Sequence, residues 1–90
     1  MKTFFFKSFA RDLKKIKDVK TLTRVKAVIE TVEEAEHLQQ LGDVKKLAGT
    51  SDSYRLRVGQ HRIGFIVDFR NNVYFVRCLD RAEFYEHFPE

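Results

Sequence analysis

Residues 54–85, YRLRVGQHRIGFIVDFRNNVYFVRCLDRAEFY, decide the fold of this chain. Apolar residues and arginines alternate at 54–58, which is the pattern of a β-strand with one buried face. Gly59-Gln60 predicts a two-residue hairpin turn, because glycine accepts the first central position of a type II′ turn. The predicted pairs are Tyr54 with Phe65, Arg55 with Gly64, Leu56 with Ile63, Arg57 with Arg62 and Val58 with His61.

A second two-residue turn is predicted at Asn71-Asn72, since asparagine tolerates the left-handed conformation. The pairs predicted across it are Arg70 with Val73, Ile66 with Arg77 and Arg62 with Arg81. In this register Arg57, Arg62 and Arg81 form one row on an exposed sheet face. Like charges directly opposite one another destabilise a sheet. The row therefore indicates a function that outweighs its cost in stability.

Arginine binds phosphate through paired hydrogen bonds and keeps its charge, so the row predicts a phosphate site. Gly64 supports this prediction, because a glycine inside a strand often marks the close approach of a ligand or another backbone. The alternative interpretation is that these are solvated arginines on an ordinary outer face.

Length and composition limit the class of protein. The 90 residues correspond to one domain, residues 1–90, and the formal charge of +4 favours an anionic partner. No long apolar run or signal peptide is present, which predicts a cytoplasmic protein that does not enter a membrane. Cys78 is the single cysteine. It excludes an intramolecular disulfide and is expected to be a buried small hydrophobe.

Two helices are predicted to follow a first strand at 2–7. The first helix has Ser8 as its N-cap, and the second begins at Asp18 or Thr21. Residues 32–41 either extend the second helix or form a separate short one. The apolar stripes of the two helices are Phe9, Leu13 and Ile16, and Leu22, Val25, Val28, Ile29 and Val32.

A short strand at 44–47 is predicted before the two hairpins, which run to Leu79. A helical turn from Arg81 to Phe88 follows, and Pro89 ends it. This order, β-α-α-β-β-β with a terminal turn, predicts an α+β domain. The sheet face expected beneath the helices carries Tyr54, Leu56, Ile63, Phe65, Val67, Val76 and Cys78. The arginine face is expected to remain open.

Segments 46–49 (KLAG), 54–63 (YRLRVGQHRI) and 81–85 (RAEFY) are the most characteristic parts of the chain. With them, essentially the whole sequence resembles the RelE/ParE superfamily of toxins from type II toxin–antitoxin modules, and its RelE-like branch in particular. The resemblance implies two N-terminal helices packed on one face of a curved antiparallel sheet. It also implies a ribosome-dependent endoribonuclease that cuts mRNA by attack of a 2′-hydroxyl on the adjacent phosphate, without a metal or other cofactor.

The resemblance implies site residues by position. The expected catalytic residues are Arg57, Arg62, Arg81 and Tyr85, and the expected RNA-binding residues are Arg55 and Arg77. In the best-known members the pair at 55 and 57 is lysine, whereas arginine does not lose its proton and makes a poor general base. The proton acceptor is then Tyr85, Glu83, His87 or a group on the ribosome.

The remaining histidines and phenylalanines are expected to have structural roles or to contact a partner. No two histidines have the spacing of metal ligands, and His61, opposite Val58, is expected to be partly buried. Phe4-Phe5-Phe6 is expected to be half core and half exposed, and an exposed ring there would suit a partner that covers it.

The implied partners are a cognate antitoxin, mRNA in the ribosomal A site and, only through the antitoxin complex, operator DNA. Two alternatives remain open. One is a ParE-like toxin that poisons DNA gyrase and has no nuclease activity, although that branch generally lacks the arginine and tyrosine set. The other is a degenerate family member that only binds its antitoxin.

Overall fold

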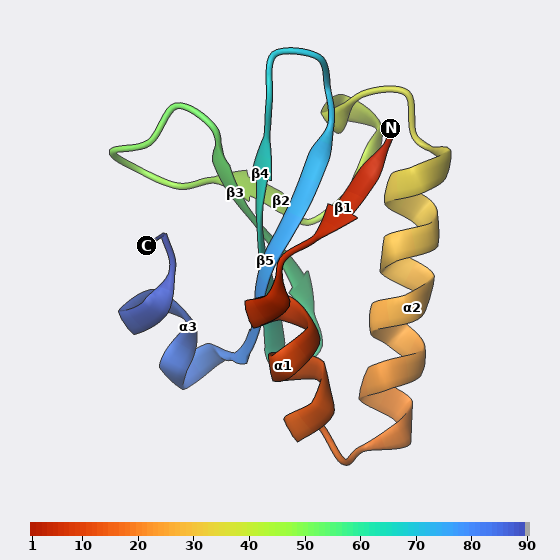
Figure 1. Cartoon of the computed structure of the whole chain (residues 1–90), viewed down its shortest axis with the longest axis vertical. Helices are drawn as coiled ribbons and strands as arrows, with labels where there is room; N and C mark the ends of the chain where they lie inside the picture. The colour runs from red at the N-terminus through yellow and green to blue at the C-terminus, as the bar shows by residue number, and fades with distance from the viewer. Residues whose placement is uncertain (90) are drawn as a thin grey trace.

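The computed structural model describes residues 1–89, in which a five-stranded sheet separates α2 from α3 (Figure 1). The elements are β1 (Thr3–Phe5), α1 (Lys7–Lys15), α2 (Val19–Glu34), a 3₁₀ turn η1 (Leu38–Gln40), β2 (Val44–Lys46), β3 (Ser53–Val58), β4 (His61–Val67), β5 (Val73–Asp80) and α3 (Arg81–His87). This order confirms the predicted α+β class, although four strands follow the two helices where the predicted order β-α-α-β-β-β has three. Within residues 1–89, none of the helices combines the length and apolar character needed to cross a membrane.

The second helix begins directly after Asp18, which is its N-cap and one of the two predicted starts. The Asp18 carboxylate accepts the backbone N–H of Lys20 at 3.3 Å, which satisfies a helix donor that has no partner within the helix. Both alternatives for 32–41 occur in part. The helix α2 continues to Glu34, and the separate turn η1 follows it.

The strand order in the sheet is β1-β5-β4-β3-β2. Strands β2 to β5 pair antiparallel, as expected, but β1 runs parallel to β5, so the sheet is mixed. The parallel pair is possible because β1 and β5 are joined by a long connection and not by a hairpin. The first strand, Thr3–Phe5, is also shorter than the predicted 2–7.

The hairpin of β3 and β4 has the predicted register at every pair, from Val58 with His61 to Tyr54 with Phe65. Gly59 has a φ of 59°, in the left-handed region that the turn requires. The arginines at 55, 57 and 62 therefore share one face of the sheet.

The register predicted for β4 and β5 was wrong. Val67 pairs with Val73, and Arg62 pairs with Leu79 instead of Arg81. The turn is wider than two residues because Asp68 organises it: its carboxylate accepts the backbone N–H groups of Arg70 and Asn72, both at 2.9 Å. A β-bulge also shifts the register between Gly64 and Phe65, and the pairing skips Val76.

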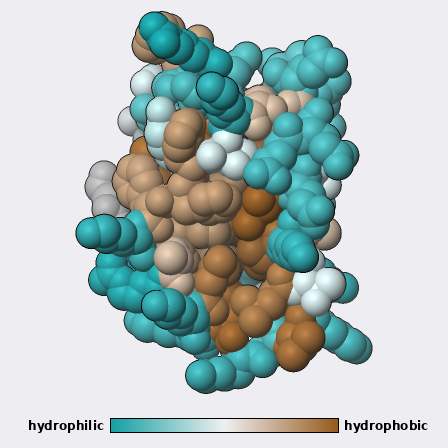
Figure 2. Space-filling model, turned by 45° about the vertical axis from the view of Figure 1, so that its right-hand side comes forward, coloured by the Kyte–Doolittle hydropathy of each residue, from teal (hydrophilic) through white to brown (hydrophobic). Residues whose placement is uncertain are grey.

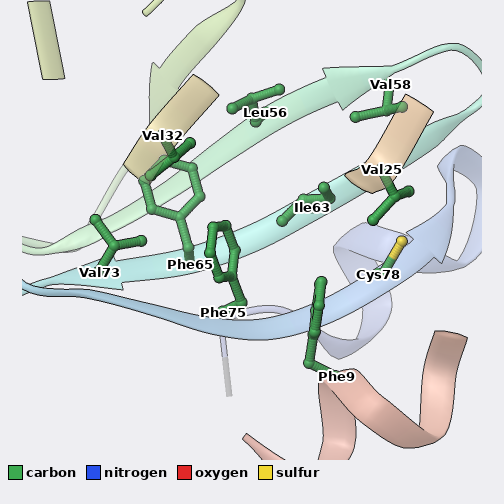
Figure 3. Packing of buried hydrophobic residues seen from close by; sticks show 10 residues of the cluster. All are labelled: Phe9, Val25, Val32, Leu56, Val58, Ile63, Phe65, Val73, Phe75 and Cys78. Atoms are coloured by element: carbon green, nitrogen blue, oxygen red, sulfur yellow. The ribbon is translucent and has the colours of Figure 1, made fainter. Parts of the chain in front are cut away.

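The main core lies between the sheet and helices α1 and α2 (Figure 3). Its buried residues are Phe9, Val25, Val32, Leu56, Val58, Ile63, Phe65, Val73, Phe75 and Cys78. Cys78 is buried as predicted, but Val76 is not in this cluster. It packs in a second cluster with Leu47, Phe84 and Phe88. The expectation of an open arginine face was therefore wrong in part, because α3 covers some of that face.

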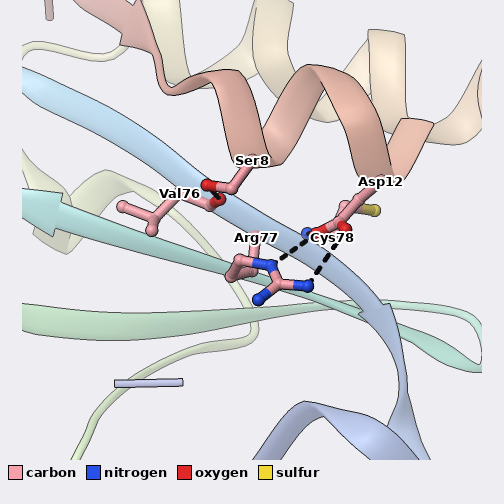
Figure 4. A network of polar contacts seen from close by, with 5 residues as sticks. All are labelled: Ser8, Asp12, Val76, Arg77 and Cys78. Carbon is pink, nitrogen blue, oxygen red and sulfur yellow. Dashed lines mark hydrogen bonds and ion pairs between the residues drawn. The ribbon is translucent and has the colours of Figure 1, made fainter. Parts of the chain in front are cut away.

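Side chains of α1 make hydrogen bonds to backbone groups of β5 that lie beyond the part paired with β1 (Figure 4). The Ser8 hydroxyl donates to the Val76 carbonyl oxygen at 2.6 Å, so the prediction of Ser8 as an N-cap was wrong. The Asp12 carboxylate accepts the Cys78 N–H at 2.9 Å. The same carboxylate accepts Nε and Nη2 of Arg77 at 2.8 and 3.1 Å. These contacts tie α1 to the strand that carries Arg77.

Burial raises the pKa of the Cys78 thiol from 9.0 to about 12, and the nearby Asp12 carboxylate adds to the shift. At pH 8 the folded protein should react with a disulfide reagent about 10³-fold more slowly than the unfolded chain, because the thiolate is the reactive form. The folded state holds this proton more tightly, so the contribution to stability is full below pH 9 and is lost between pH 9 and about 12. Labelling rates across a urea titration would check this, and fast labelling without urea would contradict it.

Candidate active site

Four arginines and one tyrosine surround a single cavity of about 380 Å³. Its lining consists of Arg55, Arg57, Arg62, Arg81 and Tyr85, with Gly59 and Gln60 of the hairpin turn. We call this cavity the arginine pocket. It brings together all four of the residues predicted to be catalytic. Of the two residues predicted to bind RNA, Arg55 lines the arginine pocket and Arg77 does not.

The first hairpin and α3 build the arginine pocket from two directions. Arg57 and Arg62 face each other across β3 and β4. Arg81 does not pair with Arg62 as the predicted register required, but it begins α3 where the helical turn was predicted to begin. Its backbone N–H donates to the Gln60 carbonyl oxygen at 2.8 Å, which fixes the start of α3 against the hairpin turn. Tyr85 lies one helical turn further along α3 and points its exposed side chain into the same cavity.

The Asp80 side chain sets the start of α3. Its carboxylate accepts the Ala82 N–H at 2.7 Å and forms a helix N-cap. Behind the pocket, Phe84 is fully buried and stacks edge to face with Tyr85, with ring centroids 5.0 Å apart. The position of Tyr85 therefore depends on the packing of its neighbour in the second apolar cluster.

The arginines of the pocket differ in burial. Arg57 and Arg81 are exposed as predicted, but Arg62 is only 7% exposed, so the prediction of a fully exposed row was wrong for Arg62. Its Nη1 donates to the carbonyl oxygens of Gly59 and His61, both at 3.0 Å. Arg62 thus holds the hairpin turn as well as lining the pocket, and its replacement should lower stability.

The charge of the pocket is not neutralised within residues 1–89. None of the four arginines forms an ion pair with a described carboxylate, whereas Arg77 pairs with Asp12. The half-buried Arg55 has an Nε atom that is buried without a hydrogen-bond partner. Arginines so close together raise the local potential and favour an anion with several oxygen acceptors, such as phosphate.

Asp12 was missed by sequence reasoning, although the sequence contains a signal for it. It lies three residues after Phe9, on the side of α1 that carries the apolar stripe, and it is buried. A charged residue at such a position needs a partner. Its partner is Arg77, whose side chain is 19% exposed. This ion pair gives Arg77 a structural role.

Gly64 was expected to mark the approach of a ligand or backbone, but the group that approaches it is the ring of Phe88. A Cβ atom at Gly64 would lie 2.6 to 2.8 Å from three atoms of that ring. Gly64→Ala should therefore destabilise the protein by about 1–3 kcal/mol and displace the segment that carries Tyr85. Urea unfolding would measure the loss.

A matched control for this substitution is Gly42→Ala, since a Cβ atom at Gly42 would meet nothing within 4 Å. The control should be neutral or slightly stabilising. Equal stabilities of the Gly64 variant and the wild type would show that the Phe88 ring moves away freely.

Candidates for other chemistry lie away from the arginine pocket. Glu83 lines a separate cavity, and His87 is exposed on α3. His61 is half-buried, as predicted, and lines the same separate cavity as Glu83. In the part of the chain that the structure describes, no group of three or more histidine, cysteine or acidic residues could hold a metal ion.

Comparisons with known proteins identify the family and the fold. The family model described as "ParE toxin of type II toxin-antitoxin system, parDE" matches residues 4–85. The curated protein "Toxin RelE3" of Methanocaldococcus jannaschii is 38% identical over 90 residues, 99% of this chain and 100% of its own length.

Solved structures show the same fold. A chain in a crystal structure of a RelB-RelE antitoxin-toxin complex from Methanococcus jannaschii matches with a TM-score of 0.81 and 35% identity, over 96% of this chain and 99% of its own. A chain of the archaeal RelE-RelB complex from Pyrococcus horikoshii matches with a TM-score of 0.73 and 21% identity, over 92% and 97% of the two chains. The resemblance seen in the sequence is confirmed: this chain belongs to the RelE/ParE superfamily of toxins of type II toxin–antitoxin systems.

Proposed function

We propose that this toxin is a metal-independent endoribonuclease that cuts mRNA in the ribosomal A site. The observation that carries the proposal is the arginine pocket, in which four arginines without a carboxylate partner surround one cavity together with Tyr85. Two curated relatives are named as RelE toxins, which supports the same function.

The proposed reaction is an attack of a ribose 2′-hydroxyl on the adjacent phosphate. The new bond joins the 2′-oxygen to phosphorus, and the bond to the 5′-oxygen of the next nucleotide breaks. The leaving 5′-oxygen takes up a proton from water, so the products are a 2′,3′-cyclic phosphate and a 5′-hydroxyl. Negative charge builds up on the phosphorane oxygens, and Arg57, Arg62 and Arg81 would stabilise that charge. Arg55 would hold the RNA backbone.

The positions of the candidate side chains indicate which of them could accept the proton of the 2′-hydroxyl. Arginine keeps its proton, so the four arginines serve as donors and as positive charges. Tyr85 lines the arginine pocket, whereas Glu83 lines another cavity. Among the side chains considered as proton acceptors, Tyr85 is therefore our candidate, because it lines the arginine pocket. A ribosomal group remains the alternative acceptor.

Primer extension on a translated mRNA, with and without ribosomes, tests this function. Cleavage should require ribosomes, leave a cyclic or 3′-phosphate end, and persist when EDTA is added under conditions that keep ribosomes intact. An mRNA that stays uncut in translating ribosomes would contradict the proposal.

The description of the matching family model favours one second candidate, a ParE-like toxin that acts on DNA gyrase without nuclease chemistry. The two candidates differ in the nucleic acid that is broken. Gyrase trapped on cleaved DNA, together with intact mRNA, would establish the second candidate.

We also propose a cognate antitoxin as the partner of this chain, as in the RelB-RelE complexes that it resembles. Phe4, Phe5 and Phe6 are 44%, 51% and 43% exposed, so the whole segment is more exposed than predicted. Apolar side chains also gather on the face that Figure 2 brings forward. A groove between α1 and α2 includes Leu13 and Ile29. Such surfaces are typical of interaction sites.

An antitoxin segment on these surfaces should bury about 2,000 Å² or more and raise the melting temperature. Co-expression with the adjacent gene, followed by purification through a high-salt wash, would test this. A complex lost at high salt would indicate charge neutralisation without apolar contact. The absence of any complex would contradict the proposed partner.

A further inference from the structure

A second cavity of about 390 Å³ lies beside the arginine pocket and shares Tyr85 with it. Its lining is mainly apolar and includes Leu47, Ala48, Phe88 and Pro89, with Lys45 and Lys46 at its rim. We call it the apolar pocket. The two pockets suit different parts of a nucleotide. The positively charged arginine pocket suits a phosphate, and the apolar pocket suits a base, which binds to apolar or aromatic surfaces.

The strand β2 gives the apolar pocket its position. Lys45 pairs with Arg55 across β2 and β3, so both side chains lie on the face that carries the arginine pocket. Leu47 lies two residues further on the same face, and its backbone N–H donates to the Ser53 carbonyl oxygen at 2.9 Å. Its side chain packs in the second cluster with Phe88. The floor of the apolar pocket is therefore part of the folded core of this face.

Tyr85 forms the boundary between the two pockets. Its side chain is 57% exposed, while its ring contacts the buried Phe84 edge to face. A tyrosine held in this way offers a ring face to a base and a hydroxyl to a phosphate. The pairing of Lys45 with Arg55 places two positive charges opposite each other, which costs stability in the absence of an anion.

We infer that the apolar pocket is a second subsite, which holds the base of the nucleotide next to the phosphate in the arginine pocket. Lys45, which pairs with Arg55 and lines the same pocket, binds an RNA phosphate next to that base. The inference rests on the proposed function, since it takes RNA as the substrate. It assigns to Lys45, Leu47 and Ala48 a role in binding single-stranded RNA.

Methyl NMR of the purified toxin tests the base pocket without ribosomes or cleavage. Adenosine 5′-monophosphate should shift the methyl signals of Ala48 and Leu47, whereas ribose 5-phosphate should leave them unchanged. The nucleotide should also bind about 10-fold more tightly than the sugar phosphate, because of the contacts of its base. Identical shifts with both ligands, confined to the arginine pocket, would overturn the base subsite.

The role of Lys45 is tested with a single-stranded oligonucleotide that lacks 2′-hydroxyls and is not cut. Lys45→Ala should weaken its binding about 10-fold and lower the slope of log affinity against log salt by about 0.7, the value of one phosphate contact. The matched control is Lys20→Ala, which removes the same charge from α2 outside this cavity. An unchanged salt slope in Lys45→Ala would overturn the role of Lys45.

The outcomes also separate this inference from the proposed function. Ribosome-dependent cleavage with no shift at Ala48 on addition of the nucleotide would overturn the subsite alone. Shifts at Ala48 and Leu47 in a toxin that leaves mRNA intact would support the subsite and contradict the proposed nuclease.

Discussion

Replacing Arg81 with Ala should lower the rate of ribosome-dependent mRNA cleavage by about 10²- to 10³-fold, the typical cost of removing one donor that stabilises charge in a transition state. Folding should be unaffected. The Arg81 side chain is exposed, and the bond that fixes α3 to the hairpin turn is made by its backbone N–H. Primer extension under single-turnover conditions, with circular dichroism for the fold, would measure both effects.

Arg70→Ala is the matched control for this variant. Arg70 is also exposed, but it lies in the turn between β4 and β5 with its guanidinium 5.4 Å from the ring centroid of Phe69. The control should cleave at a rate close to that of the wild type. Equal rates for Arg81→Ala and the wild type would exclude Arg81 from catalysis, and unfolding of Arg81→Ala would show that the residue is structural.

Asp12→Ala should lower the free energy of unfolding by about 3–5 kcal/mol, the range for breaking a buried ion pair. Three hydrogen bonds end on this carboxylate, two from Arg77 and one from the Cys78 N–H. The substitution leaves those donors without their partner, in the part of β5 that β1 does not pair. Because small domains have about 5–15 kcal/mol in total, the variant should be partly unfolded at 37 °C. Urea unfolding monitored by circular dichroism would measure the loss.

Two variants divide this loss between charge and hydrogen bonding. Asp12→Asn keeps an acceptor for the Cys78 N–H and should lose less stability than Asp12→Ala. The double variant Asp12→Ala/Arg77→Met should recover part of the loss, because it removes the cation together with its partner. If Asp12→Ala is as stable as the wild type, the contacts in Figure 4 contribute little to the fold.

The first hairpin could be predicted in full from sequence because all its determinants are local. Gly59 meets the need for a left-handed turn residue, and the alternation of residues 54–58 fixes which face is buried. Three of the four arginines of the pocket follow from this register. The family and its fold were predictable from this hairpin together with segments 46–49 and 81–85, all of which lie within the matched residues 4–85.

The second hairpin could not be predicted in this way, since two local signals compete in it. Asn71 does adopt the left-handed conformation, with a φ of 62°. However, the Asp68 carboxylate captures the N–H groups of Arg70 and Asn72 and widens the turn. The wider turn and the β-bulge together moved the strand partner of Arg62 from Arg81 to Leu79, although both arginines still line the arginine pocket.

The sequence by itself determined the order of the elements, the first hairpin and the types of residue in the arginine pocket, because turn chemistry and apolar periodicity act over a few positions. Only the tertiary structure decided how Arg81 and Tyr85 reach that pocket, through α3 and its bond to Gln60. It also decided that Phe88 occupies the space at Gly64. These contacts join residues far apart in the chain. The local sequence does not distinguish between the possible long-range partners, and the packing of the folded chain decides which of them meet.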